Sequence, residues 1–133
     1  MIPELTEDVL ADGGKCAVCG GRIAHGESVW RLEVEKGGME RRQYLHQSCH
    51  YSVNESAFWS FFWDNDACVV VRVVVFPDGN GWGVYSQREG RAIHRWGRVF
   101  ESRYSARESV DQRKDFTRLV AWGACRPRQT VAA

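Results

Sequence analysis

Two short residue pairs with the same internal spacing constrain this chain more than any other feature of its sequence. They are Cys16-x2-Cys19 and His46-x2-Cys49, and 26 residues lie between them. Three thiolates and one imidazole fill the four tetrahedral positions of a structural zinc site. The spacing therefore predicts one structural zinc ion, and its ligands are Cys16, Cys19, His46 and Cys49.

The residues around the two pairs predict a knuckle, a hairpin and a helix, in that order. Gly20-Gly21 gives the knuckle the backbone freedom that a turn around a metal needs. The predicted hairpin consists of strands 28–35 and 39–45, joined at Gly37-Gly38. A helix from about Gln47 follows, and residues three apart on it share a face. This is the order of a treble-clef zinc finger.

Other histidines and cysteines are weaker candidates. A redox Cys-x-x-Cys of the thioredoxin type lies between a strand and a helix, whereas a hairpin follows here. His50 is an alternative to His46 as a ligand, although it breaks the spacing. His25 lies in a glycine-flanked turn and is expected at the surface. Cys68 opens an apolar strand and is expected to be buried, and Cys125 suggests no role.

The rest of the sequence predicts an α+β protein with an antiparallel meander packed on the finger. Expected helices cover residues 4–11, 56–63 and 108–122, and expected strands cover 67–76, 82–87 and 91–100. Phe58, Trp59, Phe61 and Phe62 are too many aromatics for a solvent face, so they are expected to be buried between the two parts. The expected division is a finger module over 1–63, the meander and a helix over 64–125, and a disordered tail over 126–133.

Composition and motifs point to a binding protein rather than an enzyme. The sequence shows no nucleophile elbow, no phosphate-binding glycine loop and no paired acids. Lone His94 lies in an expected strand and is interpreted as structural. No apolar run approaches the roughly 20 residues of a membrane span, and the N-terminus is acidic rather than signal-like. We therefore expect a cytoplasmic protein, or a nuclear one if its source has a nucleus.

Charge is distributed unevenly along the chain. Residues 1–87 contain seven Lys/Arg and twelve Asp/Glu, a net −5, and residues 88–133 contain eleven and five, a net +6. A basic C-terminal third favours a polyanionic partner, although an arginine-rich solvated surface gives the same composition.

The residues around the two pairs also resemble a known family. Cys16-Ala-Val-Cys19, Gly26-Glu27 and Tyr44-Leu-His46-Gln-Ser-Cys49 look like the poly(ADP-ribose) polymerase-type zinc finger over residues 15–50. Half of a LIM domain reads similarly, but no second zinc module follows Cys49. Trp96-Gly97-Arg98-Val99 is similar to the WGR domain of the same polymerases. The finger resemblance implies binding to DNA ends or junctions.

The expected nucleic-acid contacts combine arginines with one aromatic side chain, a combination suited to phosphates and unpaired bases. They are Arg91, Arg95, Trp96 and Arg98 in the C-terminal third, with Arg41 and Arg42 in the finger. Trp96 is equally consistent with a core position, since it faces opposite to Arg95 in a strand. The competing function is a protein-interaction module, such as an adaptor or a phage or mobile-element inhibitor of a host complex.

Overall fold

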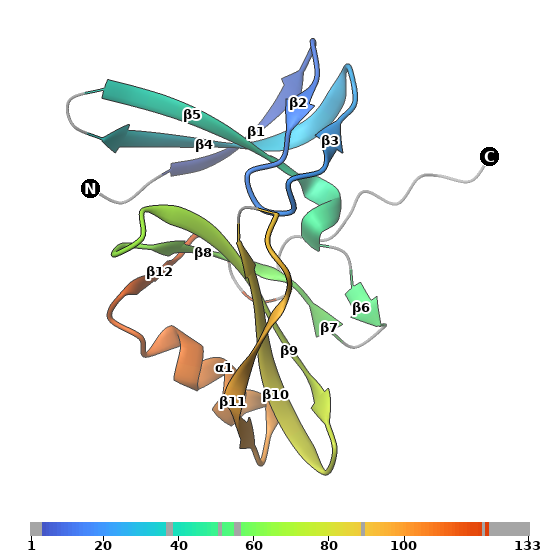
Figure 1. Ribbon diagram of the computed structural model, residues 1–133, viewed down its shortest axis with the longest axis vertical. Helices are drawn as coiled ribbons and strands as arrows, with labels where there is room; N and C mark the ends of the chain where they lie inside the picture. The colour runs from blue at the N-terminus through green and yellow to red at the C-terminus, as the bar shows by residue number, and fades with distance from the viewer. Residues whose placement is uncertain are drawn as a thin grey trace.

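The computed structural model describes residues 4–36, 39–50, 52–54, 57–88, 90–120 and 122. These residues form mostly antiparallel strands with one α-helix, which confirms the α+β class. The two larger sheets have three and five strands. In Figure 1 the three-stranded sheet lies above the other, and the helix lies against the lower sheet. Within the described residues, no helix is long and apolar enough to cross a membrane.

The upper sheet has the strand order β1-β4-β5. Its strands are β1 (Glu4–Leu10), β4 (Glu27–Lys36) and β5 (Met39–His46). The predicted hairpin is therefore confirmed in its two strands, whereas the helix predicted over residues 4–11 is wrong. Those residues pair with β4, for example Leu5 with Leu32. A segment of about two turns is marginal as a helix, and the free edge of β4 offers it backbone partners along its length.

The lower sheet has the order β11-β10-β9-β8-β12 and is antiparallel throughout. Its strands are β8 (Ser60–Asp64), β9 (Val69–Asp78), β10 (Gly81–Arg88), β11 (His94–Phe100) and β12 (Phe116–Arg118). The meander is confirmed as β9, β10 and β11, although β11 begins at His94 rather than at Arg91. A short hairpin of β6 (Ser52–Asn54) and β7 (Ala57–Phe58) precedes the sheet.

Strand β8 replaces the helix predicted over residues 56–63, which is wrong. All five of its residues are buried, and its side chains alternate between the two faces of the sheet. Phe61 and Trp63 pack in a core cluster with the finger, whereas Phe62 packs in a second cluster under the helix. A central strand covered on both faces is apolar throughout, a pattern shared with a buried helix. Burial is confirmed for Phe61, Phe62 and Trp59, but of these only Phe61 lies between the two parts, since Trp59 belongs to a third cluster with Val74. The side chain of Phe58 lies outside the described residues.

Helix α1 (Arg103–Asp111) covers one face of the lower sheet. Ser102 caps it, because its Oγ accepts a hydrogen bond from the Ser105 N–H at 3.0 Å. Ala106 and Val110, four residues apart, form its buried stripe. The helix predicted over 108–122 is wrong in its bounds, because the next apolar residue, Phe116, is six residues beyond Val110 and falls off that stripe. Phe116 begins β12 instead.

One core cluster joins the two sheets. It contains Val18, Ile23, Val29, Leu32 and Leu45 from the finger and Phe61, Trp63 and Val70 from the lower sheet, together with two zinc-ligand candidates. The finger thus covers part of the sheet face that α1 leaves open. The predicted boundary after residue 63 falls inside β8, and the domain division stays a prediction. The tail predicted over 126–133 lies outside the described residues.

Candidate metal centre

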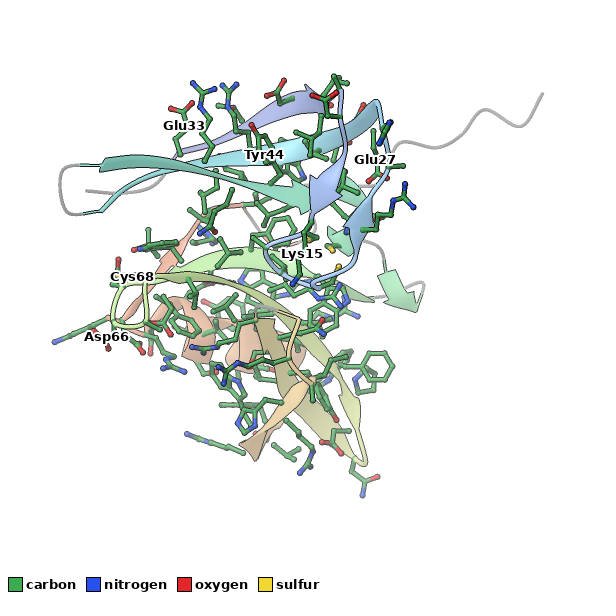
Figure 2. All side chains as sticks on the ribbon, turned by 45° about the horizontal axis from the view of Figure 1, so that its top comes forward. Lys15, Glu27, Glu33, Tyr44, Asp66 and Cys68 are labelled. Carbon is green, nitrogen blue, oxygen red and sulfur yellow. The ribbon has the colours of Figure 1, made fainter. Side chains whose placement is uncertain are left out.

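Three separate elements bring the four predicted ligands together. Cys16 and Cys19 lie in the turn between β2 (Gly14–Lys15) and β3 (Arg22–Ile23), His46 ends β5, and Cys49 lies in the 3-10 helix η1 (Gln47–His50). One ligand atom from each residue lies within 4.8 Å of all the others. Figure 2 shows yellow sulfur atoms gathered beside the labelled Lys15.

The spacing of these atoms fits a tetrahedral zinc site. Zinc bonds of about 2.3 Å to sulfur and 2.0 Å to nitrogen imply S···S separations of about 3.8 Å and S···N separations of about 3.5 Å. The Cys16 and Cys49 sulfurs are 3.7 Å apart, and His46 Nδ1 is 3.2 Å from the Cys19 sulfur and 3.8 Å from that of Cys49. The residues present therefore fit one zinc ion.

The knuckle is built by backbone hydrogen bonds that also point amides at the sulfurs. The Cys16 N–H donates to the Gly21 carbonyl at 2.9 Å, and the Gly20 N–H donates to the Cys16 carbonyl at 3.0 Å. The amides of Val18 and Gly21 then lie 3.4 and 3.3 Å from the sulfurs of Cys16 and Cys19. N–H groups aimed at sulfur favour the thiolate form, which is the form that binds a metal.

The second ring nitrogen of His46 fixes the orientation of the imidazole. Nε2 lies 2.7 Å from the Arg22 carbonyl oxygen and 3.8 Å from a Glu27 carboxylate oxygen. A carbonyl can only accept, so Nε2 carries the proton and Nδ1 presents its lone pair to the sulfurs. Metal-binding histidines commonly have such an outer partner, which sets the tautomer.

A hydrogen bond couples two of the buried thiols, Cys16 and Cys49, whose sulfurs are 3.7 Å apart. The hydrogen bond with Cys49 lowers the pKa of Cys16 to about 4, against the opposing effect of burial, and backbone N–H groups assist. The same hydrogen bond, together with burial, raises the pKa of Cys49 far above its ordinary value. A divalent cation takes the place of the proton in this hydrogen bond, because a cysteine binds a metal as its thiolate.

The other histidines and cysteines considered from the sequence lie outside this ligand set or outside the described residues. His25 is exposed, as predicted, whereas the side chain of His50 lies outside the described residues. Cys68 is half-buried in the turn before β9 rather than buried in the strand, because its left-handed backbone (φ 56°) ends that turn. Figure 2 shows it beside Asp66. Cys125 lies outside the described residues.

A second group of close acidic side chains consists of Asp64 at the end of β8, Asp66 in the turn that follows it and Asp115 just before β12. Arg88 pairs with Asp64 at 2.8 Å, and Arg113 pairs with Asp115. The two arginines offset the negative charges of Asp64 and Asp115, so ion pairing accounts for the close approach of these carboxylates without a metal ion.

The six predicted nucleic-acid residues do not share one surface. Arg95 bonds Asp78 at 2.7 Å on the face of the lower sheet opposite α1. Trp96 points toward α1, where its indole N–H donates to the Ser86 hydroxyl and its ring meets Phe116 edge-on. Trp96 therefore packs against the core, which is the second of the two positions considered for it from the sequence. Arg98 lies over the Phe100 ring on that same face.

The remaining predicted contacts lie elsewhere. Arg91 is exposed in the loop before β11, and Arg42 in the finger pairs with Glu33 at 3.6 Å. The side chain of Arg41 lies outside the described residues. That these residues contact nucleic acid stays a prediction.

Sequence reasoning missed two features of the lower sheet. One is a hollow of about 340 Å³ beside the loop between β10 and β11, lined by Ser86, Gln87, Arg88, Arg91, Ala92 and His94. The other is an apolar groove of about 320 Å³ on the open sheet face, lined by Trp59, Val74, Phe76, Tyr85 and Ile93. The Arg88-Glu-Gly-Arg91 turn was a signal for the hollow. The residues that line the groove come from four separate segments, so no single stretch of the sequence predicts it.

No protein-family model matches the chain, and no curated protein or solved structure matches it significantly. The resemblance of residues 15–50 to polymerase-type fingers therefore stays a resemblance in ligands and spacing.

Proposed function

We propose that this chain is a non-enzymatic, zinc-organised protein that binds nucleic acid through the loop between β10 and β11. The observation that carries the proposal is the hollow at this loop, where the exposed Arg91 and His94 lie beside Arg88, whose own charge is paired with Asp64. Arginine side chains of this kind suit contact with phosphate groups. The resemblance of residues 15–50 to the poly(ADP-ribose) polymerase-type zinc finger supports a preference for DNA ends or junctions.

The zinc ion in this proposal is structural. Four protein ligands leave it no open position for water or substrate, so the site supports no metal-assisted chemistry. The finger follows the treble-clef order of knuckle, hairpin and helix, with the helix reduced to the four residues of η1. Its role is to hold the knuckle and β5 in one arrangement.

The knuckle holds the basic loop directly. The Gly90 N–H donates to the Val18 carbonyl at 2.7 Å, between the two zinc-ligand cysteines of the knuckle. The backbones at Gly20 and Gly90 touch, since a Cβ added to Gly20 would lie 2.9 Å from the Gly90 Cα. Both glycines have positive φ. Zinc binding therefore sets the position of the loop that carries Arg88 and Arg91.

A side-chain relay makes a second connection between the metal centre and this loop. Arg72 on β9 donates to the Cys49 carbonyl at 3.3 Å and to the Gln87 amide oxygen at 2.8 Å. The Gln87 amide nitrogen in turn donates to the Arg91 carbonyl at 2.8 Å. The loop is thus held by the Cys16–Cys19 knuckle through Gly90 and by Cys49 through Arg72 and Gln87. These contacts pre-organise Arg91 for binding.

A salt titration of binding tests this function. The wild-type protein is expected to bind a DNA oligonucleotide with an affinity that falls steeply with salt, because each phosphate contact releases counterions. Arg91→Ala should flatten the log–log slope by about 0.9 units on duplex and about 0.7 on a single strand. Arg118→Ala is the matched control, since Arg118 lies on β12 at the opposite edge of the sheet and pairs with Asp111.

Two results would contradict the proposal: no measurable affinity for duplex, end-bearing or single-stranded DNA at low salt, or equal slopes for the two variants. The protein-interaction function would then take its place. The edge position of β11 and the 46% exposure of Val99 on it favour that function, because an open strand edge can pair with a partner strand.

A further inference from the structure

The open face of the lower sheet carries an aromatic groove that the zinc centre does not use. Its floor is Val74, 2% exposed, and its walls are Trp59, Phe76 and Tyr85, with Ile93 at the rim. Its volume of about 320 Å³ is at the small end of ligand sites, which suits one flat ring system better than a helix or strand. The lining is almost wholly apolar, so any ligand group that enters it does so by packing.

The ring geometry of the groove suits a planar ligand. Phe76 and Tyr85 meet at 86° with centroids 6.4 Å apart, which forms a perpendicular aromatic corner. A flat ring placed there stacks on one side chain and meets the other edge-on, the two arrangements that aromatic pairs prefer. Both side chains are half-buried, so each has surface left to cover.

The charged groups beside the groove leave one positive charge unmatched. The Arg72 guanidinium lies 4.3 Å from the centre of the Trp59 ring and bonds the neutral Gln87 amide, whereas Arg95 and Asp78, next to Tyr85, form an ion pair whose charges cancel. The rim thus repels a cationic ligand, although aromatic walls alone would suit one. The charges instead complement an anion attached to the flat ring.

The groove adjoins the basic hollow of the proposed function. Ile93 lines the groove, and its neighbours Ala92 and His94 line the hollow. Arg72 connects the two, because it covers Trp59 in the groove and bonds Gln87 in the hollow. The groove and the hollow therefore share the loop before β11, with Ile93 in the lining of the first and its two sequence neighbours in the lining of the second.

We propose, building on the nucleic-acid function above, that this groove takes an unpaired base of a single strand while the hollow holds its phosphate. A paired base is stacked inside a duplex and cannot enter a groove of this kind without leaving the helix. The protein accordingly prefers single-stranded segments, frayed ends and junctions over continuous duplex. Base stacking on aromatic side chains is tolerant of sequence, so the preference is for strandedness.

The test compares three probes on the zinc-loaded full chain: a thymidine oligonucleotide, an abasic strand of the same length, and a duplex of that length. The thymidine strand should bind at least about fivefold more tightly than the abasic strand, which keeps the phosphates and lacks the bases. Phe76→Leu, which keeps apolar volume and loses the ring face, should remove most of that difference. Val99→Leu on β11 is the control, because Val99 is exposed outside the groove.

Ile93→Glu gives a second variant that is expected to fold, because Ile93 is 52% exposed. It places a negative charge between groove and hollow and should weaken single-strand binding more than duplex binding. Equal affinity for thymidine and abasic strands, with an unchanged salt dependence, would overturn the groove inference and leave the nucleic-acid function in place. Absence of binding to every probe would overturn both. A dimer in sedimentation that Ile93→Glu makes monomeric would assign the groove to a second copy of this chain instead.

Discussion

His46 shows how one side chain serves both the metal and the fold. Its Nδ1 lies among the sulfurs, while its Nε2 is held by the Arg22 carbonyl at 2.7 Å. The imidazole therefore ties the end of β5 to the start of β3 whether or not metal is present. A zinc ion bound at this site would add the stronger connection, since structural zinc contributes a folding free energy on the order of 10 kcal/mol.

The first prediction at this scale concerns the ligands themselves. Cys49→Ser should abolish stoichiometric zinc and unfold the knuckle, because a serine hydroxyl does not replace the buried thiolate. Metal analysis of the purified wild-type protein should give about one zinc per chain, and thermal unfolding of the variant should begin well below that of the wild type. Cys68→Ser is the control. Cys68 is outside the ligand set, so this variant protein should still bind one zinc per chain. A folded, fully reduced wild-type sample without zinc would disprove the structural role.

At the scale of elements, the contact between the knuckle and the basic loop makes the sharpest prediction. In Gly90→Ala the new Cβ would lie 3.0 Å from the Gly20 Cα and 3.2 Å from the Cys19 carbonyl oxygen. Gly79→Ala is a matched control, because Gly79 also has positive φ but has open space around it. Both variants incur about 1–2 kcal/mol of backbone strain.

Gly90→Ala must in addition separate the loop from the knuckle. It should therefore unfold at lower denaturant concentration than Gly79→Ala and bind DNA more weakly, whereas Gly79→Ala should keep wild-type affinity. Equal effects of the two substitutions on both denaturant midpoint and affinity would mean that the knuckle does not position the loop.

The same scale shows where sequence reasoning succeeded and where it failed. The grouping of Cys16, Cys19, His46 and Cys49 follows from their spacing, because zinc chemistry restricts which residues can serve, and that these four residues hold zinc stays a prediction. The strands around Gly79 follow from strong turn residues. Residues 4–10 were misjudged because their pairing partner, β4, lies beyond the knuckle in sequence. Residues 60–64 were misjudged although β9 follows them directly after the turn at residues 65–68. Burial on both faces removes the alternation that identifies a strand, so β8 carried no periodic signal.

For the whole molecule, the shared core predicts one cooperative unfolding transition. Phe61 is fully buried on β8 and packs in the cluster that includes Cys16 and Cys49. Phe61→Ala should cost about 3–5 kcal/mol and lower the denaturant midpoint seen by far-UV circular dichroism and by zinc release together. Val9→Ala is the control, since Val9 is 57% exposed and its truncation should change stability by less than about 0.5 kcal/mol. Two separated transitions in the wild-type protein would show that the finger and the lower sheet unfold independently.

The touching backbones of Gly20 and Gly90 also provide a criterion for recognising proteins of the same build. Neither position has room for a side chain, so a substitution at one cannot be compensated at the other by a smaller residue. A chain with this arrangement must combine the Cys-Cys-His-Cys spacing with a glycine directly after the second cysteine and another in the turn between β10 and β11. The paired glycines distinguish such a chain from fingers that merely share the ligands, even where the rest of the two sequences has diverged beyond comparison.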